Sequence, residues 1–333
     1  MDDQIPVPAL STTAPTPIPY KNRLTGLRVF GILTILMGGL AALFVPLLLL
    51  VSGAMAARTA SAPTSITDVL PTVFAYGLVA VVLIWLGIGS VMARRWARAL
   101  LLIVSWIWLI LGLLMAVCLG FLMPRIIAQS AARQDMPPGA IVAMIAVMTV
   151  ILGILFIVIP AIWTLFYRSP HVKATCEARD PVARWTDACP LPVLAASLWV
   201  AFSALFLLFM PLSGHAVIPC FGLYLAGAAR TAACVLLAGL WGYCAWQMYK
   251  LERRGWWLIL AAMVLYCASF QITFAAHGID EMHRAAGYSE AQIAQIRSIG
   301  LFAGKRMAWF VLIATISWAG YLLCIGKYFR RRA

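Results

Sequence analysis

The sequence predicts an all-α, polytopic transmembrane helix bundle of about eight spans. Of the 333 residues, 64% are apolar and 11% are charged, and the mean hydropathy is +0.95. Soluble domains are about half apolar and about a quarter charged, so this composition excludes an ordinary water-soluble domain. The apolar residues form long runs, which excludes a transmembrane β-barrel, because barrel strands alternate apolar and polar residues.

Eight apolar runs are long enough to cross a bilayer, which takes about 20 mostly apolar residues. In chain order they cover residues 29–51, 71–93, 99–123, 140–167, 191–212, 228–249, 256–276 and 307–328. Pro46 and Pro160 lie inside the first and fourth runs, where we expect kinks. Residues 216–227, before the sixth run, are apolar but too few to span, and we expect an interfacial or re-entrant piece.

The eight spans divide the chain into two halves of four. Residues 1–24 are a Pro- and Thr-rich tail that we expect to be disordered. Residues 25–168 form the first half, 169–190 a connector loop, and 191–333 the second half, with an amphipathic segment at 284–304.

The amphipathic segment carries a helix-start signal. Ser289 and Gln292 fit a capping box, and isoleucines follow at helical spacing. We expect a short interfacial helix there, with a lid or a partner surface as the alternatives.

The connections after the second and the sixth span are similar. Residues 87–98 (GIGSVMARRWAR) and 242–257 (GYCAWQMYKLERRGWW) both place small residues before the membrane exit and then give a short basic turn with tryptophan. Because each half has an even number of spans, a duplication would make the halves parallel repeats. The sequence therefore suggests a 4+4 parallel pseudo-repeat, although constraints shared by any four-span unit would give the same similarity.

The G-x-G-x5-R-W-A-R turn within residues 87–98 resembles a hairpin of small uncharacterised bacterial membrane proteins. The resemblance implies a bacterial inner-membrane origin and no particular activity. Most of the 25 Lys and Arg residues lie in the connections on the side of the two termini, which predicts that both termini are cytoplasmic. Since these residues flank the spans, the net charge of +14 is a topology signal, and we expect no nucleic-acid partner.

The predicted spans contain no Asp or Glu, and Arg230 is the charged side chain that we place inside a span. Ion-coupled carriers usually hold an ionisable residue at mid-membrane, so the missing carboxylates disfavour coupled transport. A facilitator or lipid-handling protein would need a polar cavity, and Arg230, Gln271 and Thr273 are the candidates to bind a substrate or a lipid headgroup there. The alternative for Arg230 is that its side chain extends to the nearer surface.

Residues 277–284 (HGIDEMHR) are the densest polar cluster. If this stretch is helical, His277 and Glu281 share one face, and His283 and His215 are further candidates to bind a metal. Histidine and carboxylate are suitable zinc ligands. The alternative is a solvated helix end.

The connector loop is the other candidate site. Cys176, Arg184, Trp185, Asp187 and Cys189 are candidates to dock a cytoplasmic partner, and the alternative is that the loop packs under the two halves. Its cysteines are not closely paired, as zinc sites require.

The sequence contains no P-loop, nucleophile elbow, HExxH motif or dinucleotide fingerprint, and we expect no cofactor. We therefore favour a non-catalytic scaffold or accessory subunit of the inner membrane. Its expected partners are membrane lipids and another membrane protein or a second copy. The alternatives are a transporter or channel for a small or lipidic solute, and a membrane enzyme or metal site at the outer face.

Overall fold

The computed structural model describes residues 20–58, 66–133, 138–212, 216–299 and 305–329. Within this part of the chain, eight helices are long and apolar enough to cross a membrane. They coincide with the eight predicted runs, and Leu191–Leu212 and Met307–Tyr328 have the predicted bounds. The chain is a multi-pass helical membrane protein, so the predicted fold class is confirmed. Residues 1–19 of the predicted tail lie outside the described residues.

The helices form two groups in chain order. The first half consists of α1 (Leu24–Arg58), α2 (Ile66–Val91), α3 (Arg95–Arg133), α4 (Pro138–Gly153), a π-helical turn (Ile154–Val158) and α5 (Ile159–Arg168). The connector contains α6 (Pro170–Arg179) and a 3₁₀ turn (Trp185–Asp187). The second half consists of α7 (Leu191–Phe209), a 3₁₀ turn (Met210–Leu212), β1 (Ile218–Cys220), β2 (Leu223–Leu225), α8 (Gly227–Tyr249), α9 (Arg253–Ala285), α10 (Glu290–Ile299), α11 (Lys305–Ile325) and a 3₁₀ turn (Gly326–Tyr328).

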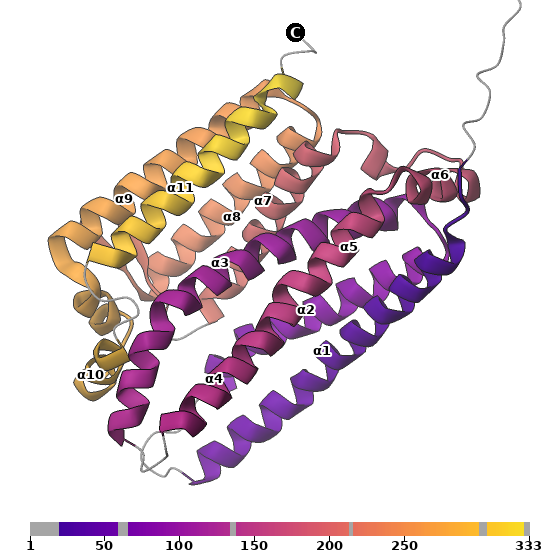
Figure 1. Ribbon diagram of the computed structural model, residues 1–333. Coiled ribbons are helices and arrows are strands. Elements are labelled where there is room, and N and C mark those ends of the chain that lie inside the picture. The colour runs from indigo at the N-terminus through magenta and orange to yellow at the C-terminus, as the bar shows by residue number, and fades with distance from the viewer. Residues whose placement is uncertain (1–19, 59–65, 134–137, 213–215, 300–304, 330–333) are drawn as a thin grey trace, which may run out of the picture.

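The long helices run side by side, with α6 and α10 at opposite ends of the bundle (Figure 1). We call these the connector end, marked by α6, and the hairpin end, where the β1–β2 hairpin lies against the later part of α9. The capping box at Ser289 is confirmed, because its hydroxyl accepts from the backbone N–H of Gln292 at 3.3 Å. Gln292 in turn accepts from the Ser289 N–H at 2.8 Å, which fixes the start of α10.

The fourth span is an interrupted helix. The π-helical turn precedes Pro160, which lies in the first turn of α5. Proline cannot donate to the helix ladder, and a π turn is a common way to absorb such a break. The irregularity expected near Pro160 is therefore present, whereas Pro46 lies inside an uninterrupted α1.

Glycines let the helices of the first half approach closely. A Cβ added to Gly31 would lie 2.8 Å from the carbonyl oxygen of Gly87, and one added to Gly87 would lie 2.7 Å from that of Gly31. A Cβ on Gly112 of α3 would overlap the carbonyl oxygen of Phe156 in the π turn. Small residues at such crossings favour helix packing in membranes, so these glycines hold the helices of the first half in close contact.

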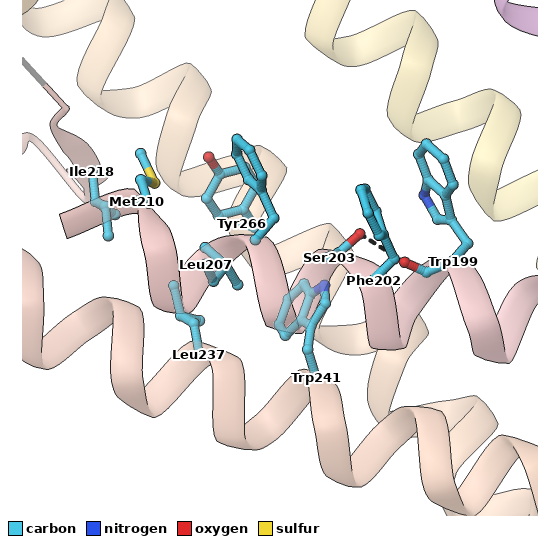
Figure 2. Close-up of a pocket in the computed structure, with 10 residues that line it drawn as sticks. Trp199, Phe202, Ser203, Leu207, Met210, Ile218, Leu237, Trp241 and Tyr266 are labelled. Carbon is cyan, nitrogen blue, oxygen red and sulfur yellow. Dashed lines mark hydrogen bonds between the residues drawn. The ribbon is translucent and has the colours of Figure 1, made fainter. Parts of the chain in front are cut away.

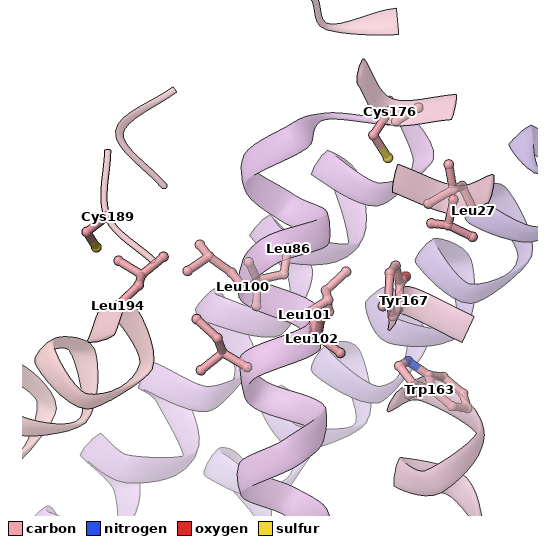
Figure 3. Packing of buried hydrophobic residues seen from close by; sticks show 13 residues of the cluster. Leu27, Leu86, Leu100, Leu101, Leu102, Trp163, Tyr167, Cys176, Cys189 and Leu194 are labelled. Carbon is pink, nitrogen blue, oxygen red and sulfur yellow. The ribbon is translucent and has the colours of Figure 1, made fainter. Parts of the chain in front are cut away.

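Two clusters of buried apolar residues lie toward the connector end. The first is shown in Figure 3, and beside it the hydroxyl groups of Ser90 and Tyr167 are hydrogen-bonded at 2.8 Å. That cluster contains Leu27, Leu86, Ala93, Leu100, Leu101, Leu102, Ile103, Trp163, Tyr167, Val172, Cys176, Cys189 and Leu194. The second contains Val193, Ala196, Val200, Cys244, Ala245, Met248, Trp256, Ile259, Leu322, Ile325 and Phe329. Because Val172, Cys176 and Cys189 belong to the first cluster, the connector is packed into the core of the first half.

The turns after α2 and α8 have the same geometry. Ala93 and Leu251 both have a positive φ, 52° and 62°. After α2, the N–H of Arg94 donates to the carbonyl of Gly89 at 2.9 Å. After α8, the N–H of Glu252 donates to that of Gln247 at 2.9 Å. A left-handed residue with such a bond is a common way for a helix to end. The shared turn geometry alone therefore does not establish the predicted repeat, which stays a prediction.

Candidate functional site

The apolar piece between α7 and α8 is a β-hairpin. In β1 and β2 Cys220 pairs with Leu223, so Phe221 and Gly222 form the two-residue turn. Both have positive φ, 41° and 96°, which is the geometry of a type I′ turn. The left-handed conformation is unusual for phenylalanine, and it needs support from neighbouring groups. The segment predicted to be interfacial or re-entrant therefore folds back on itself as a hairpin.

Side chains of α9 supply that support. The Ser269 hydroxyl accepts a hydrogen bond from the N–H of Phe221 at 3.0 Å. The Thr273 hydroxyl accepts one from the N–H of Gly222 at 2.9 Å, and Nε2 of His277 donates to the Gly222 carbonyl at 2.7 Å. Residues four apart lie on one face of a helix, so Ser269, Thr273 and His277 form a polar row. We call it the α9 row.

The α9 row is buried at one end and exposed at the other. Ser269 and Thr273 are 4% and 0% exposed. His277 is at the exposed end, and its Nδ1 lies 3.0 Å from Oε2 of Glu281. Both ring nitrogens thus face oxygen acceptors. The Tyr224 hydroxyl donates to the carbonyl of Gly278 at 2.9 Å, which adds a bond between β2 and α9.

The predicted metal ligands come together only in part. His277 and Glu281 are in contact, whereas the ring of His283 packs edge-on against Tyr288. His215 lies outside the described residues. Among the residues that the structure describes, no three His, Cys, Asp or Glu side chains are grouped so as to hold a metal ion.

Arg230 ties the end of the α7 span to the start of the β1–β2 hairpin. It is 8% exposed, and its guanidinium donates to the carbonyl of Ala216 at 2.7 Å and to that of Pro211 at 3.0 Å. Gln271 donates to the carbonyl of Ala308 at 2.8 Å and so ties α9 to α11. Of the three residues predicted to bind a substrate or a headgroup, Arg230 and Thr273 hold the hairpin loop and Gln271 joins two helices.

The connector is held by Asp180 at the end of α6. Its carboxylate is buried, 3% exposed, and accepts from Nη2 of Arg184 at 2.9 Å. Arg94 lies 3.7 Å from it, and the N–H of Arg95 donates to it at 3.4 Å. The hydrogen bond from Arg184 is the main cause that lowers the pKa of Asp180 below its ordinary value. This carboxylate fastens the connector to the turn between α2 and α3.

The connector also reaches both halves. The N–H of Arg23, ahead of α1, donates to the Thr175 hydroxyl at 3.1 Å. Nε of Arg95 lies 3.4 Å from the Asp187 carboxylate. At the end of α8, the Tyr249 hydroxyl donates to the carbonyl of Trp185 at 3.0 Å. The connector therefore packs under the two halves, and the docking of a partner on its outer side stays a prediction.

The connector cysteines are buried thiols. Cys176 and Cys189 are 1% and 6% exposed, and both are free. Burial raises the pKa of each thiol to about 11, so both stay protonated near neutral pH and are poor nucleophiles and metal ligands. Trp185 is different, because its side chain is 44% exposed.

A cavity of about 440 Å³ lies between α7, α8 and α9 (Figure 2). It is lined by Trp199, Phe202, Ser203, Phe206, Leu207, Met210, Ile218, Leu237, Trp241 and Tyr266. We call it the aromatic groove. The Ser203 hydroxyl donates to the carbonyl of Trp199 at 2.9 Å, so this polar group is satisfied within its own helix. Sequence reasoning missed the groove, although Trp199, Phe202 and Phe206 recur at helical spacing and mark one face of α7.

Comparison with known proteins gives no match to a family model, a curated protein or a solved structure.

Proposed function

We propose that the protein is a non-catalytic scaffold or accessory subunit of the bacterial inner membrane, with the connector end in the cytoplasm. One observation carries the proposal: the polar side chains that could perform chemistry instead hold segments of the chain in place. Arg230 and Thr273 hold the hairpin loop, and Asp180 and Asp187 hold the connector.

A fastened connector end also argues against alternating access. Transporters built from two halves usually work by rocking one half against the other. Here the connector bonds to the turn between α2 and α3 through Asp180 and to the end of α8 through Trp185. Movement of the halves at this end would break these bonds, so a static role is favoured over the alternative of a transporter.

The surface that we assign to a partner protein is the outer side of the connector. Trp185 and Val182 are 44% and 62% exposed there. Trp185 is joined to α8 through its backbone carbonyl, which leaves the indole ring available. An exposed aromatic side chain on a rigid support is the usual form of an interface anchor.

The test is native mass spectrometry of the full-length protein released from native-lipid nanodiscs. We expect a second polypeptide at fixed stoichiometry, and we expect Trp185→Ala to lose it, because only the ring is removed. Trp257→Ala is the matched control, since Trp257 is 52% exposed in the first turns of α9 at the same end of the molecule. A bare monomer together with solute flux in proteoliposomes would contradict the proposal.

A further inference from the structure

We propose that the aromatic groove binds the hydrocarbon chain of a membrane lipid. This inference goes beyond the scaffold role. Most of the lining residues belong to the membrane spans Leu191–Leu212, Gly227–Tyr249 and Arg253–Ala285, so the groove lies at the depth of the lipid chains. Its volume of about 440 Å³ falls within the roughly 300–1,000 Å³ of small-molecule sites.

Residues of the protein mark both ends of the groove. Toward the connector end, Val200 of α7 and Ile259 of α9 are 2% and 0% exposed and belong to the second buried cluster. Toward the hairpin end, Met210 and Ile218 complete the lining. The hairpin that carries Ile218 is fixed by the α9 row, so this part of the lining is held in place.

The long side of the groove is open. Phe202, Phe206 and Tyr266 line it and are still 45%, 49% and 43% exposed. Because the lining residues belong to membrane-spanning helices, a lipid chain is the occupant available at this depth of the membrane. The occupant that can enter is therefore a lipid chain arriving sideways from the bilayer.

The chemistry of the lining agrees with such an occupant. The stick view shows the rings of Trp199, Phe202, Trp241 and Tyr266 along the groove (Figure 2). Flat aromatic faces offer many dispersion contacts to a flexible chain. In a bilayer the chain leaves one apolar medium for another, so the gain must come from closer packing. We therefore expect one lipid that is retained more firmly than the lipids around the protein.

The experiment compares two neighbouring positions of α8. Leu237 lines the groove, whereas Leu236 is 75% exposed and does not. The protein is extracted from vesicles of phosphatidylethanolamine and phosphatidylglycerol, washed in detergent and analysed by native mass spectrometry. We expect the wild type and Leu236→Trp to retain one phospholipid per chain and Leu237→Trp, in which the indole fills the groove, to lose it by at least tenfold.

A second variant guards against a folding defect in Leu237→Trp. Ser203→Leu adds volume at the groove wall while the Trp199 carbonyl that Ser203 contacts stays in its helix. Both variants should unfold at the wild-type temperature or above it, because filling a cavity adds contacts.

Three results would overturn the inference. One is that the wild type retains no lipid after washing. Another is that both groove variants keep the same lipid as Leu236→Trp. The third is a homodimer that Leu237→Trp dissociates, because the occupant would then be a second copy of this chain. A partner polypeptide appears at its own mass in the same spectrum, so failure of the lipid inference is distinguishable from failure of the scaffold proposal.

Discussion

The two halves of the bundle share one packing plan. The separation in residue number between Ala93 and Leu251, the two residues of positive φ in the turns, can be applied to the whole first half. It then places α1, α2, α3 and the α4–α5 span on α7, α8, α9 and α11. This offset also pairs buried positions: Leu86 with Cys244, Leu101 with Ile259, and Tyr167 with Ile325.

The offset extends to bonds between helices. In the first half the indole N–H of Trp163 donates to the Thr34 hydroxyl at 3.4 Å. In the second half the Tyr321 hydroxyl donates to the carbonyl of Pro192 at 2.7 Å. Both bonds tie the last helix of a half to its first, at equivalent positions. Equivalent positions of the two halves are therefore buried or hydrogen-bonded alike, although their residue types differ. This is the pattern expected of a 4+4 parallel repeat whose sequences have diverged.

The halves differ where their third and fourth spans cross. In the first half Gly112 brings α3 against the backbone at Phe156. The same offset places Phe270 and Ala314 at these positions of the second half. The large and the small residue have exchanged helices, so the backbones cannot meet in the same way. The two halves therefore share one plan but cross differently: Gly112 brings two backbones into contact in the first half, whereas the aromatic groove lies in the second half.

The largest expected effect comes from disrupting the close contact between α3 and the π-helical turn in the first half. Gly112→Leu should lower the free energy of unfolding by about 4 kcal/mol or more, because its side chain would overlap the Phe156 backbone, and effects of this size come from such overpacking. Gly120→Leu is the control in the same helix, since a Cβ there meets nothing within 4 Å. Thermal unfolding in nanodiscs measures both, and equal melting temperatures would contradict the closed crossing.

A smaller effect is expected from loosening the connector between the halves. Asp180→Asn removes the charge that accepts from Arg184 and should cost about 2 kcal/mol, between the values for exposed and buried ion pairs. We expect thermal unfolding in nanodiscs to occur at a lower temperature than in the wild type. Glu290→Gln is the control, because its ion pair with Arg284 is exposed, and it should leave unfolding unchanged.

Low pH should destabilise the protein as Asp180→Asn does, because both remove the negative charge of Asp180. The pKa of Asp180 is lowered from its ordinary value of 3.8 in the folded protein. Its contribution to stability is therefore complete above pH 3.8 and is lost as the pH falls through the folded pKa. The wild type should lose stability relative to Asp180→Asn below this value, and parallel pH profiles of the two proteins would contradict the role of this carboxylate.

The spans could be predicted from the sequence because hydropathy is a local property. The helix start at Ser289 could also be predicted, since its partner Gln292 is three residues away. The hairpin could not, because its strands are three residues each and their support comes from Ser269 and Thr273, about 50 residues later in the chain.

The roles of the candidate residues depended on the same distant contacts. Arg230 and Thr273 are the polar residues that sequence reasoning selected, but their partners are backbone groups of the hairpin loop. One wall of the groove is legible in α7, whereas Leu237 and Tyr266 join it only once α8 and α9 are packed. A sequence pattern identifies a face of a helix, and the fold decides what that face meets.

The smallest expected effect sharpens the comparison at the hairpin, which caps the groove of the second half. Thr273→Val removes the acceptor for the Gly222 N–H and should cost about 1 kcal/mol. Hydrogen exchange at Phe221 and Gly222 should become faster. Thr315→Val is the matched control, because its hydroxyl donates only within its own helix, to Val311.

If the hairpin is what separates the groove from the hairpin end, Thr273→Val should also weaken lipid retention, and Thr315→Val should not. Faster exchange with unchanged lipid retention would mean that the groove is defined by the helices alone, and that the two halves differ at their crossing and not at their cap.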